Sequence, residues 1–436
     1  MTSESAGRFS GAGPAVGGEA MQSRRSWASP WVVGSGGSNY QPGTSWHLAP
    51  TSTSVDRDEV RDRSGLRVTQ RYVDRTSERH RTSARSSVVD DLDPVPLAAT
   101  LERIVEPAAA HHVGLVTGID VAGRVVVRGH GRAGPGGLPP GADTEVEIGS
   151  ITKVLTGLLL AVLVEDGVVR LEQPVNDLLP PDARLPTAGR PVTLLELATH
   201  TSGLPRLPAG WFWRGLRQDR SDPYSGFGAT DLDRAIRNVR PGRRRGRISY
   251  SNFGMGQLGY ALETHAREDY ESLVRRLICA PLGLDHTWIT PPPAVDDTIP
   301  VDRATGHDRR GRPVPGWQFP VLAGAGAFHS TVSDLLTLLR AQTRPDDGST
   351  LHRAMALTHQ RRIRRGPLGQ ALGWVSLEHR PGDPRPTLWH NGGTGGFRSF
   401  CAIQPDQQCR VVVVANDSRS VDRIGWDLVR ALRGAD

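Results

Sequence analysis

A serine and a lysine three residues apart, Ser150 and Lys153, are the first candidates for chemistry in this sequence. Lys153 is the only lysine in the chain, and every other basic position outside the histidines is arginine. Arginine keeps its proton in a protein, whereas a buried lysine can release one. The pair therefore predicts a serine nucleophile activated by a neutral amine. The alternative is that a single lysine was retained without a special role.

The pKa that such a base needs decides where the lysine must lie. A free lysine has a pKa of about 10.4, whereas a base that works near neutral pH needs about 7 to 8. Proximity to a helix N-terminus supplies at most about 2 kcal/mol, but burial can shift a lysine by about 3–5 units. The apolar run from Val154 to Val164 offers that burial, and residues three apart share one helix face.

Two further short segments carry suitable groups. Tyr250-Ser251-Asn252 offers a phenol that can relay a proton and an amide that can hold the lysine and a substrate carbonyl. Its alternative interpretation is a polar loop before the next helix. His390 lies in the stretch Trp389-His390-Asn391-Gly392-Gly393-Thr394-Gly395-Gly396, where glycines at a strand edge let a backbone approach a ligand closely. Its alternative is a glycine-rich hairpin turn with an incidental histidine.

Hydrophobic periodicity predicts the elements that position these groups. Helices are expected from about Pro96 and at 151–165, 194–199, 232–239, 253–266, 270–279 and 421–432, and strands at 112–121, 124–129, 372–377, 387–390, 398–403 and 410–415. Short strands with turns between them indicate an antiparallel sheet. The fold class is therefore α+β, with an antiparallel sheet flanked by helices plus a mostly helical subdomain.

Composition divides the chain near residue 94. Residues 1–94 are rich in Ser, Gly, Thr and Arg with interleaved charges, and such segments bury too little apolar surface to fold. They are expected to be a disordered low-complexity tail. Residues 95–436 are expected to form the folded domain, with a helical insert at about 176–298.

Charge and motif content argue against several classes of protein. The 53 cationic and 46 anionic residues leave a net charge of +7 over 436 residues, and no nucleic-acid-binding motif accompanies them, so no nucleic-acid partner is expected. Neither a metal-ligand set nor a phosphate-binding loop is evident, so no metal and no cofactor is expected. Cys401 and Cys409 either bridge across a hairpin or remain free thiols.

No apolar segment is long enough to cross a membrane, because the run at 154–164 is about half of the ~20 residues required. No clear signal peptide is present either. The sequence therefore indicates a cytoplasmic protein by default, with export as the alternative if the true start lies elsewhere.

Two other clusters have two interpretations each. Five arginines between Arg240 and Arg247 form either a solvated loop or a rim that steers anionic substrates. Trp211-Phe212-Trp213 either belongs to a satellite core or lines an acyl pocket.

Together, the three candidate segments resemble the penicillin-recognising serine hydrolases, especially class C β-lactamases, D-alanyl-D-alanine carboxypeptidases and related esterases. The resemblance covers roughly Leu97 to the C-terminus, and it implies a β-lactamase/transpeptidase-like fold. It extends to segments beyond the three motifs: 147–153, 195–205, 250–254, 281–284 and 324–331.

The resemblance also implies a role for each residue. Ser150 would be acylated, Lys153 would activate it, and Tyr250 would pass the proton to the leaving group or share the role of base. Asn252 would orient both substrate and lysine. Gly392 would allow close strand approach, and the backbone N–H groups of Ser150 and Gly393 would form the oxyanion hole.

One departure from the family pattern bears on the substrate. Many β-lactamases have lysine where this chain has His390, and a histidine is charged only part of the time near neutral pH. A weaker pull on a substrate carboxylate favours a peptidase, esterase or amidase over a dedicated β-lactamase.

The sequence thus predicts a serine hydrolase that cleaves an amide or ester of a small molecule or peptide through an acyl-enzyme. One alternative is a carboxylesterase of small acyl esters. The alternative from another class is an inactive penicillin- or peptide-binding protein. The sequence does not set the oligomeric state.

Overall fold

The computed structural model describes residues 94–187, 189–209, 211, 222–240, 242, 245–290, 302–344, 347–380 and 386–433. Apart from Pro94, the segment predicted to be a tail lies outside the described residues, as do Phe212 and Trp213.

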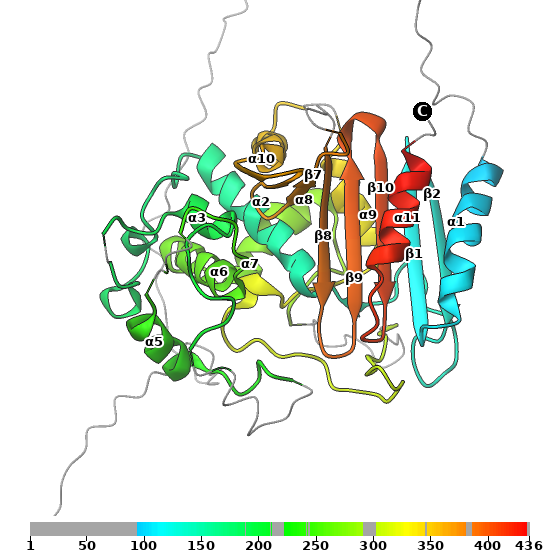
Figure 1. Ribbon diagram of the computed structural model, residues 1–436, viewed down its shortest axis with the longest axis horizontal. Helices are drawn as coiled ribbons and strands as arrows, with labels where there is room; N and C mark the ends of the chain where they lie inside the picture. The colour runs from blue at the N-terminus through cyan, green and yellow to red at the C-terminus, as the bar shows by residue number, and fades with distance from the viewer. Residues whose placement is uncertain are drawn as a thin grey trace, which may run out of the picture. The chain divides into compact units, whose positions relative to one another are not determined.

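An eight-stranded antiparallel sheet forms the centre of the described domain (Figure 1). From one edge to the other its strands are β2 (Arg124–Gly131), β1 (Gly114–Val121), β10 (Cys409–Ala415), β9 (Arg398–Gln404), β8 (Thr387–Gly393), β7 (Val375–Leu377), β6 (Leu368–Gln370) and β5 (Ile363–Arg365). The N-terminal hairpin therefore joins the C-terminal strands, with β1 paired to β10. The predicted α+β class with an antiparallel sheet is confirmed.

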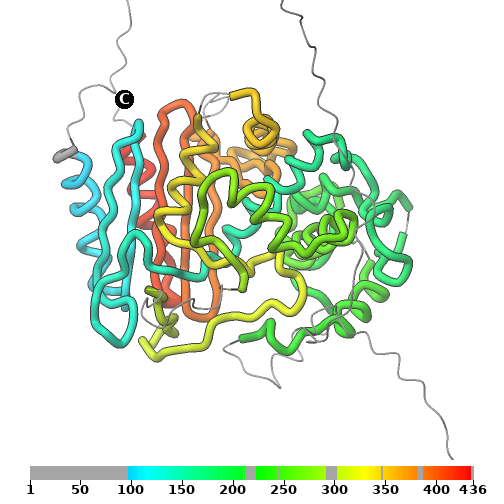
Figure 2. The backbone as a smooth tube through the Cα atoms, turned by 180° about the vertical axis from the view of Figure 1, so that it is seen from behind, coloured from blue at the N-terminus to red at the C-terminus, as the bar shows by residue number. Residues whose placement is uncertain are grey.

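Helices cover both faces of this sheet, and strand alternation explains how. Val411 and Val413 pack towards α1 (Pro94–Ala109) and α11 (Asp422–Leu432). Val412 and Val414 belong to the opposite core, which includes α2 (Thr152–Glu165) and α9 (Val332–Ala341). Figure 2 shows α9 across the face opposite α1 and α11. Because successive side chains of a strand point to opposite faces, this uninterrupted valine run serves two cores.

Helix α2 is the most enclosed element of the site. Each of its residues from Thr152 to Leu163 is buried, as the nearly continuous apolar run predicted. Glycine makes this packing close, since a Cβ atom at Gly157 would lie 2.4 Å from the carbonyl oxygen of Leu372. Lys153 is therefore carried on a helix with no solvent-facing side at its first three turns.

The helical part of the domain lies beside α2, away from β1 and β2 (Figure 1). Its helices are α3 (Leu194–Ala198), α5 (Ala229–Asn238), α6 (Asn252–Ala266), α7 (Tyr270–Val274) and α8 (Ala280–Leu282), with a π-helical turn at Arg275–Cys279 between the last two. Helix α6 begins directly after Tyr250-Ser251, so Tyr250 lies just before the N-terminus of a helix. The side chain of Ser251 caps that helix by accepting the N–H of Gly254 at 2.8 Å.

Several elements differ from the sequence prediction. Helices α9 and α10 (Thr350–His359) and strands β5 and β6 were not predicted. Strand β8 continues through Gly392 and Gly393, where a turn was the alternative. Cys401 and Cys409 are both free and buried. They lie on opposite faces of the sheet, in different cores, so a bridge between them is excluded.

Candidate active site

The turn that carries Ser150 is pressed against strand β8. Ser150 lies in a 3₁₀ turn, Gly149–Ile151, immediately before α2. Gly149 has φ +52°, and a Cβ atom there would lie 2.6 Å from the nitrogen of Gly393. At Gly392 an added Cβ would lie 2.1 Å from the carbonyl oxygen of Ile148. Only glycine allows this approach, which brings the serine beside the end of β8.

The amine of Lys153 contacts Ser150 directly. Its Nζ lies 2.9 Å from Ser150 Oγ and 2.5 Å from the backbone oxygen of Ala325. The lysine side chain is fully buried. Burial, followed by repulsion from Arg206, holds its pKa well below 10.5. The amine can therefore be uncharged and accept a proton.

Tyr250 contacts the same serine oxygen from another side. Its hydroxyl lies 2.9 Å from Ser150 Oγ, and burial raises its pKa to about 12. The phenol therefore stays protonated near neutral pH. Its ring packs 4.5 Å from the ring of His200, whose Nδ1 accepts the backbone N–H of Ser251 at 3.2 Å. His200 thus acts as a structural support behind the tyrosine.

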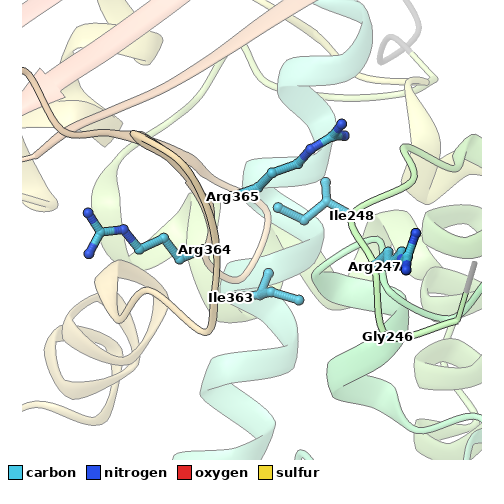
Figure 3. Close-up of a pocket in the computed structure, with 6 residues that line it drawn as sticks. All are labelled: Gly246, Arg247, Ile248, Ile363, Arg364 and Arg365. Atoms are coloured by element: carbon cyan, nitrogen blue, oxygen red, sulfur yellow. The ribbon is translucent and has the colours of Figure 1, made fainter.

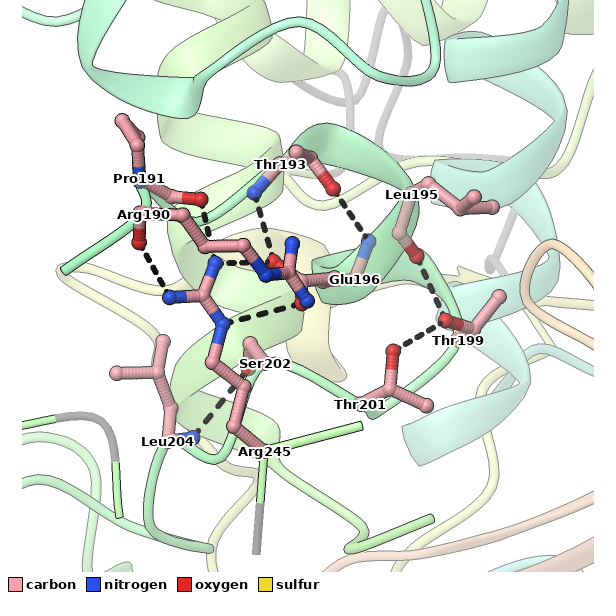
Figure 4. Close-up of polar contacts among 10 residues, drawn as sticks. All are labelled: Arg190, Pro191, Thr193, Leu195, Glu196, Thr199, Thr201, Ser202, Leu204 and Arg245. Atoms are coloured by element: carbon pink, nitrogen blue, oxygen red, sulfur yellow. Dashed lines mark hydrogen bonds and ion pairs between the residues drawn. The ribbon is translucent and has the colours of Figure 1, made fainter. Parts of the chain in front are cut away.

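The loop that includes His200 is anchored by Glu196 (Figure 4). Thr193 Oγ1 accepts the N–H of Glu196 at 3.2 Å, and Glu196 Oε2 accepts the N–H of Thr193 at 3.1 Å. This capping box starts α3. Arg190 and Arg245 each lie 2.7 Å from the carboxylate of Glu196. The buried carboxylate of Glu196 therefore links the segment just before Tyr250, through Arg245, to the loop that contains His200.

Ser150 opens into a cleft of about 560 Å³ between the β8–β9 hairpin and the helical part. That volume suits a small molecule or peptide end. The lining residues come from six stretches of the chain: Ser150; Arg206, Leu207, Trp211, Pro223 and Tyr224; Tyr250 and Asn252; Trp317; Asn391, Gly392, Gly393, Thr394 and Arg398; and Ser420 and Asp422. The structure thus brings together six of the seven predicted site residues with a contact to the cleft or to Ser150.

Asn252 lines the cleft but contacts a different partner from the one expected. Its Nδ2 donates to the hydroxyl of Tyr224 at 3.0 Å, whereas the amine of Lys153 donates a hydrogen bond to the backbone oxygen of Ala325. The Oδ1 atom of Asn252 is buried and has no hydrogen-bond partner among the residues that the structure describes. Because buried polar atoms are normally paired, this oxygen is available to accept an N–H group from a substrate.

His390 is the seventh predicted residue, and the structure places it outside the cleft lining. Its ring is buried and does not line the cleft. Burial, followed by the charge of Lys153, lowers its pKa to about 3, so the ring is neutral near pH 7. Its Nδ1 lies 2.7 Å from the oxygen of Asn391, and its centroid lies 6.3 Å from that of Tyr250. His390 therefore packs behind the phenol.

Arg398 places a guanidinium group in the lining of the cleft. Its Nη1 donates to the backbone oxygens of Thr394 at 2.6 Å and Phe397 at 2.7 Å. The guanidinium lies directly over Gly393, since a Cβ atom there would be 3.0 Å from Nη1. Sequence patterns gave no signal for this residue, because it follows the glycine-rich stretch without a motif of its own.

An aromatic wall and a carboxylate line other parts of the cleft. The ring of Tyr224 lies 4.3 Å from that of Trp211 and 5.1 Å from that of Trp317. Both oxygens of Asp422 lie 3.1 Å from Nδ2 of Asn391. Trp211 had an acyl pocket as one of its two interpretations; the others were not predicted.

Within the part of the chain that the structure describes, no group of three or more His, Cys, Asp or Glu residues could hold a metal ion. Over the same residues, no helix has both the length and the apolar character needed to span a membrane.

Residues 101–435 match the family model described as Beta-lactamase. Among curated relatives, the D-alanyl-D-alanine-carboxypeptidase/endopeptidase AmpH of Escherichia coli strain K12 is 30% identical over 310 residues, or 67% of this chain and 76% of that protein. A protein named Beta-lactamase from the same strain is 27% identical over 330 residues, or 68% and 82%.

Solved structures show the same architecture. A class C beta lactamase from Rhodobacter sphaeroides superposes with a TM-score of 0.65 at 26% identity, covering 77% of this chain and 99% of that one. A beta-lactamase from Sulfitobacter sp. EE-36 gives a TM-score of 0.66 at 23% identity over 79% and 99%, a likeness of fold alone.

Proposed function

Because the chain belongs to the beta-lactamase family and is a serine hydrolase, we propose that Ser150 is its nucleophile and that it cleaves an amide bond through an acyl-enzyme. The observation that carries this proposal is the single oxygen of Ser150, which an amine and a phenol both contact at 2.9 Å.

Lys153 is the base of the acylation step in this proposal. The low pKa of its amine leaves a lone pair for the Ser150 proton, while the high pKa of Tyr250 keeps the phenol a donor. Oγ of Ser150 then bonds to the substrate carbonyl carbon, and the serine proton passes to Lys153. The two pKa directions favour the amine over the phenol as base, an alternative that the sequence left open.

Two backbone N–H groups, those of Ser150 and Gly393, are proposed to stabilise the oxyanion. The close approach of Gly149 to Gly393 supports this assignment, because it places the serine turn and the end of β8 together. One such donor contributes about 10²–10³-fold in rate.

Tyr250 is proposed to protonate the leaving group. As the carbon–nitrogen bond breaks, the phenol gives its proton to the departing amine of the substrate. The phenol then regains a proton from Lys153, so the lysine side chain is neutral again. In deacylation a water molecule attacks the ester carbon, Lys153 accepts its proton, and that proton returns to Ser150 as the carboxylic acid product leaves. Lys153 thus accepts the proton of the nucleophile in both acylation and deacylation.

Peptides ending in D-alanyl-D-alanine are the proposed substrate class, and the similarity to the carboxypeptidase AmpH supports this choice. A peptide end carries a carboxylate beside the scissile bond. Arg398, over Gly393, is the proposed partner for that carboxylate, and Asn252 Oδ1 is the proposed acceptor for the amide N–H. A bidentate guanidinium suits a planar carboxylate.

A carboxylesterase is the second candidate, favoured by one observation. The rings of Trp211, Tyr224 and Trp317 form an apolar wall that accepts an acyl group without any need for a carboxylate.

Mass spectrometry after exposure to a fluorophosphonate or a penicillin tests the mechanism, with Ser150→Ala as control. We expect one adduct on the peptide containing Ser150. An unmodified Ser150, or an adduct that persists in Ser150→Ala, would remove this serine as nucleophile. Turnover of a D-Ala-D-Ala peptide, a chromogenic cephalosporin and a nitrophenyl ester, measured side by side, then separates the substrate classes.

A further inference from the structure

Two arginine-rich stretches more than a hundred residues apart in sequence meet at a second cavity. It has a volume of about 570 Å³ and is lined by Gly246, Arg247 and Ile248 on one side and by Ile363, Arg364 and Arg365 of β5 on the other (Figure 3). None of these residues lines the catalytic cleft. Of the arginines between Arg240 and Arg247, those that the structure describes do not line the rim of the active site.

Some arginines of the two stretches are already neutralised. Arg245 binds Glu196. Arg361 and Arg364 both pair with Glu378, and Figure 3 shows the Arg364 side chain directed away from Ile248 and Arg247. These contacts stabilise the fold and leave little charge for a ligand.

Arg247 and Arg365 differ from those neighbours. Both line the cavity and are exposed, and neither side chain has a hydrogen bond or ion pair within the described residues. Two unpaired guanidinium groups that line one cavity favour binding of an anion there, because arginine binds phosphate and carboxylate through two parallel N–H groups.

Two apolar side chains also line this cavity. Ile248 and Ile363 are partly buried and line the cavity from its two walls, and Figure 3 shows their side chains between the two backbone segments. An inorganic anion would leave this apolar surface exposed to water, whereas a hydrocarbon group would cover it. Burial of apolar surface stabilises a complex by about 25 cal/mol per Å².

We propose that this cavity binds an organic anion with an apolar portion, a phosphate or carboxylate head on a short hydrocarbon chain. Arg247 and Arg365 hold the head, and Ile248 and Ile363 contact the hydrocarbon. The volume lies in the range of small-molecule sites. The site is separate from the catalytic cleft, so ligand and substrate bind at the same time.

The wall formed by residues 246–248 leads directly to the catalytic tyrosine. Gly246 N donates to Thr201 O at 2.8 Å, and Ser249 N donates to His200 O at 2.8 Å. Tyr250 follows Ile248 by two residues and rests on the ring of His200. A ligand in this cavity therefore contacts the segment that positions the phenol of Tyr250.

Calorimetric titration of the full chain tests the proposal with octyl phosphate, inorganic phosphate and octyl glucoside. We expect octyl phosphate to bind at a single site, about tenfold or more tighter than either other probe. The Arg247→Gln/Arg365→Gln variant should lose about tenfold or more in affinity. The matched control, Arg103→Gln/Arg170→Gln, removes the same charge from two other exposed positions and should bind as the wild type does.

Three outcomes would overturn the proposal: no binding to the wild type, equal loss in both double variants, or inorganic phosphate binding as tightly as octyl phosphate. Arg398→Gln adds a fourth check. If that variant loses octyl phosphate binding, the ligand occupies the catalytic cleft. Circular dichroism of each variant confirms that it is folded.

Discussion

Nζ of Lys153 lies 2.5 Å from the backbone oxygen of Ala325. A neutral amine has two N–H groups and one lone pair. Donation of one N–H to a fixed carbonyl leaves the lone pair free to face Ser150 Oγ, 2.9 Å away. A backbone acceptor from a distant loop thus orients the proposed base, a role that the sequence had given to Asn252.

Lys153→Met tests that base. Methionine keeps the apolar volume but has no proton acceptor of comparable strength, so acylation by a penicillin or ester should fall by about 10²–10⁴-fold. Stopped-flow or mass-spectrometric acylation rates measure it. A rate within several-fold of the wild type would exclude lysine as the base.

The same variant has a pH-dependent effect on stability. The folded-state pKa of Lys153 lies below 10.5 because of burial. Between the two pKa values the unfolded chain binds more protons, so the wild-type free energy of unfolding rises with pH. Lys153→Met should therefore be the more stable protein at neutral pH, and its advantage should shrink as pH approaches 10.5. Urea titrations at several pH values would show a constant difference if the amine were not desolvated.

Tyr250→Phe separates two roles for the phenol. With a pKa of about 12, Tyr250 is expected to donate a proton to the leaving group. An amide needs that proton and a nitrophenyl ester does not, so kcat/KM should fall by about 10²–10⁴-fold for the amide and far less for the ester. Equal losses for both substrates would instead identify Tyr250 as the base for Ser150.

Much of the scaffold was predictable because its signals are local. The apolar run from Val154 to Val164 predicted a buried helix, and Lys153 is indeed buried in it. The strands at 398–403 and 410–415 were predicted as short strand candidates with turns between them. Short strands such as β5 and β6, three residues each, are too brief for periodicity to reveal.

The site was predicted less fully, because its remaining parts depend on tertiary contacts. The position of His390 in sequence suggested a cleft residue, but alternation along β8 turns its ring behind Tyr250. Arg398 reaches the cleft because antiparallel pairing of β9 with β8 places it opposite Gly393. Ala325 accepts the hydrogen bond of Lys153 through its backbone oxygen, and a pattern of side chains cannot predict a backbone contact of this kind.

Arg398→Gln tests the proposed carboxylate partner. Wild type should prefer an acyl-D-Ala-D-Ala peptide over its C-terminal amide, and the variant should lose about 10–100-fold of that preference, in line with a charged hydrogen bond. The ratio of kcat/KM values for the two peptides measures it. Arg309→Gln, an exposed neighbour outside the cleft, is the matched control. An unchanged ratio in Arg398→Gln would exclude carboxylate recognition even if Ser150 is acylated normally.

Glu147→Gln tests a buried carboxyl that contacts the cleft wall. Glu147 Oε1 accepts the N–H of Trp317 at 3.2 Å, and burial, with repulsion from Asp222, raises its pKa from 4.5 to about 7. The folded protein then binds more protons than the unfolded chain between these values. Wild-type stability should therefore fall across this window by on the order of 3 kcal/mol. The difference in unfolding free energy between variant and wild type should grow from pH 4.5 to 7, and a flat difference would show that the carboxyl is solvated.

Gly392→Ala tests the approach between β8 and the serine turn. The new methyl group would lie 2.1 Å from the oxygen of Ile148 and 2.3 Å from Ser399 Oγ, so the strand must move away. That movement is expected to cost about 1–3 kcal/mol in stability. It should also slow acylation, because the N–H of Gly393 moves with the strand.

The matched control is Gly136→Ala, since no atom lies within 4 Å of a Cβ atom at Gly136 and its φ is not positive. Thermal unfolding and acylation rates of the two variants measure the contrast. If Gly392→Ala acylates like the control, the close approach is not needed for catalysis. The oxyanion site would then lie elsewhere than between Ser150 and Gly393.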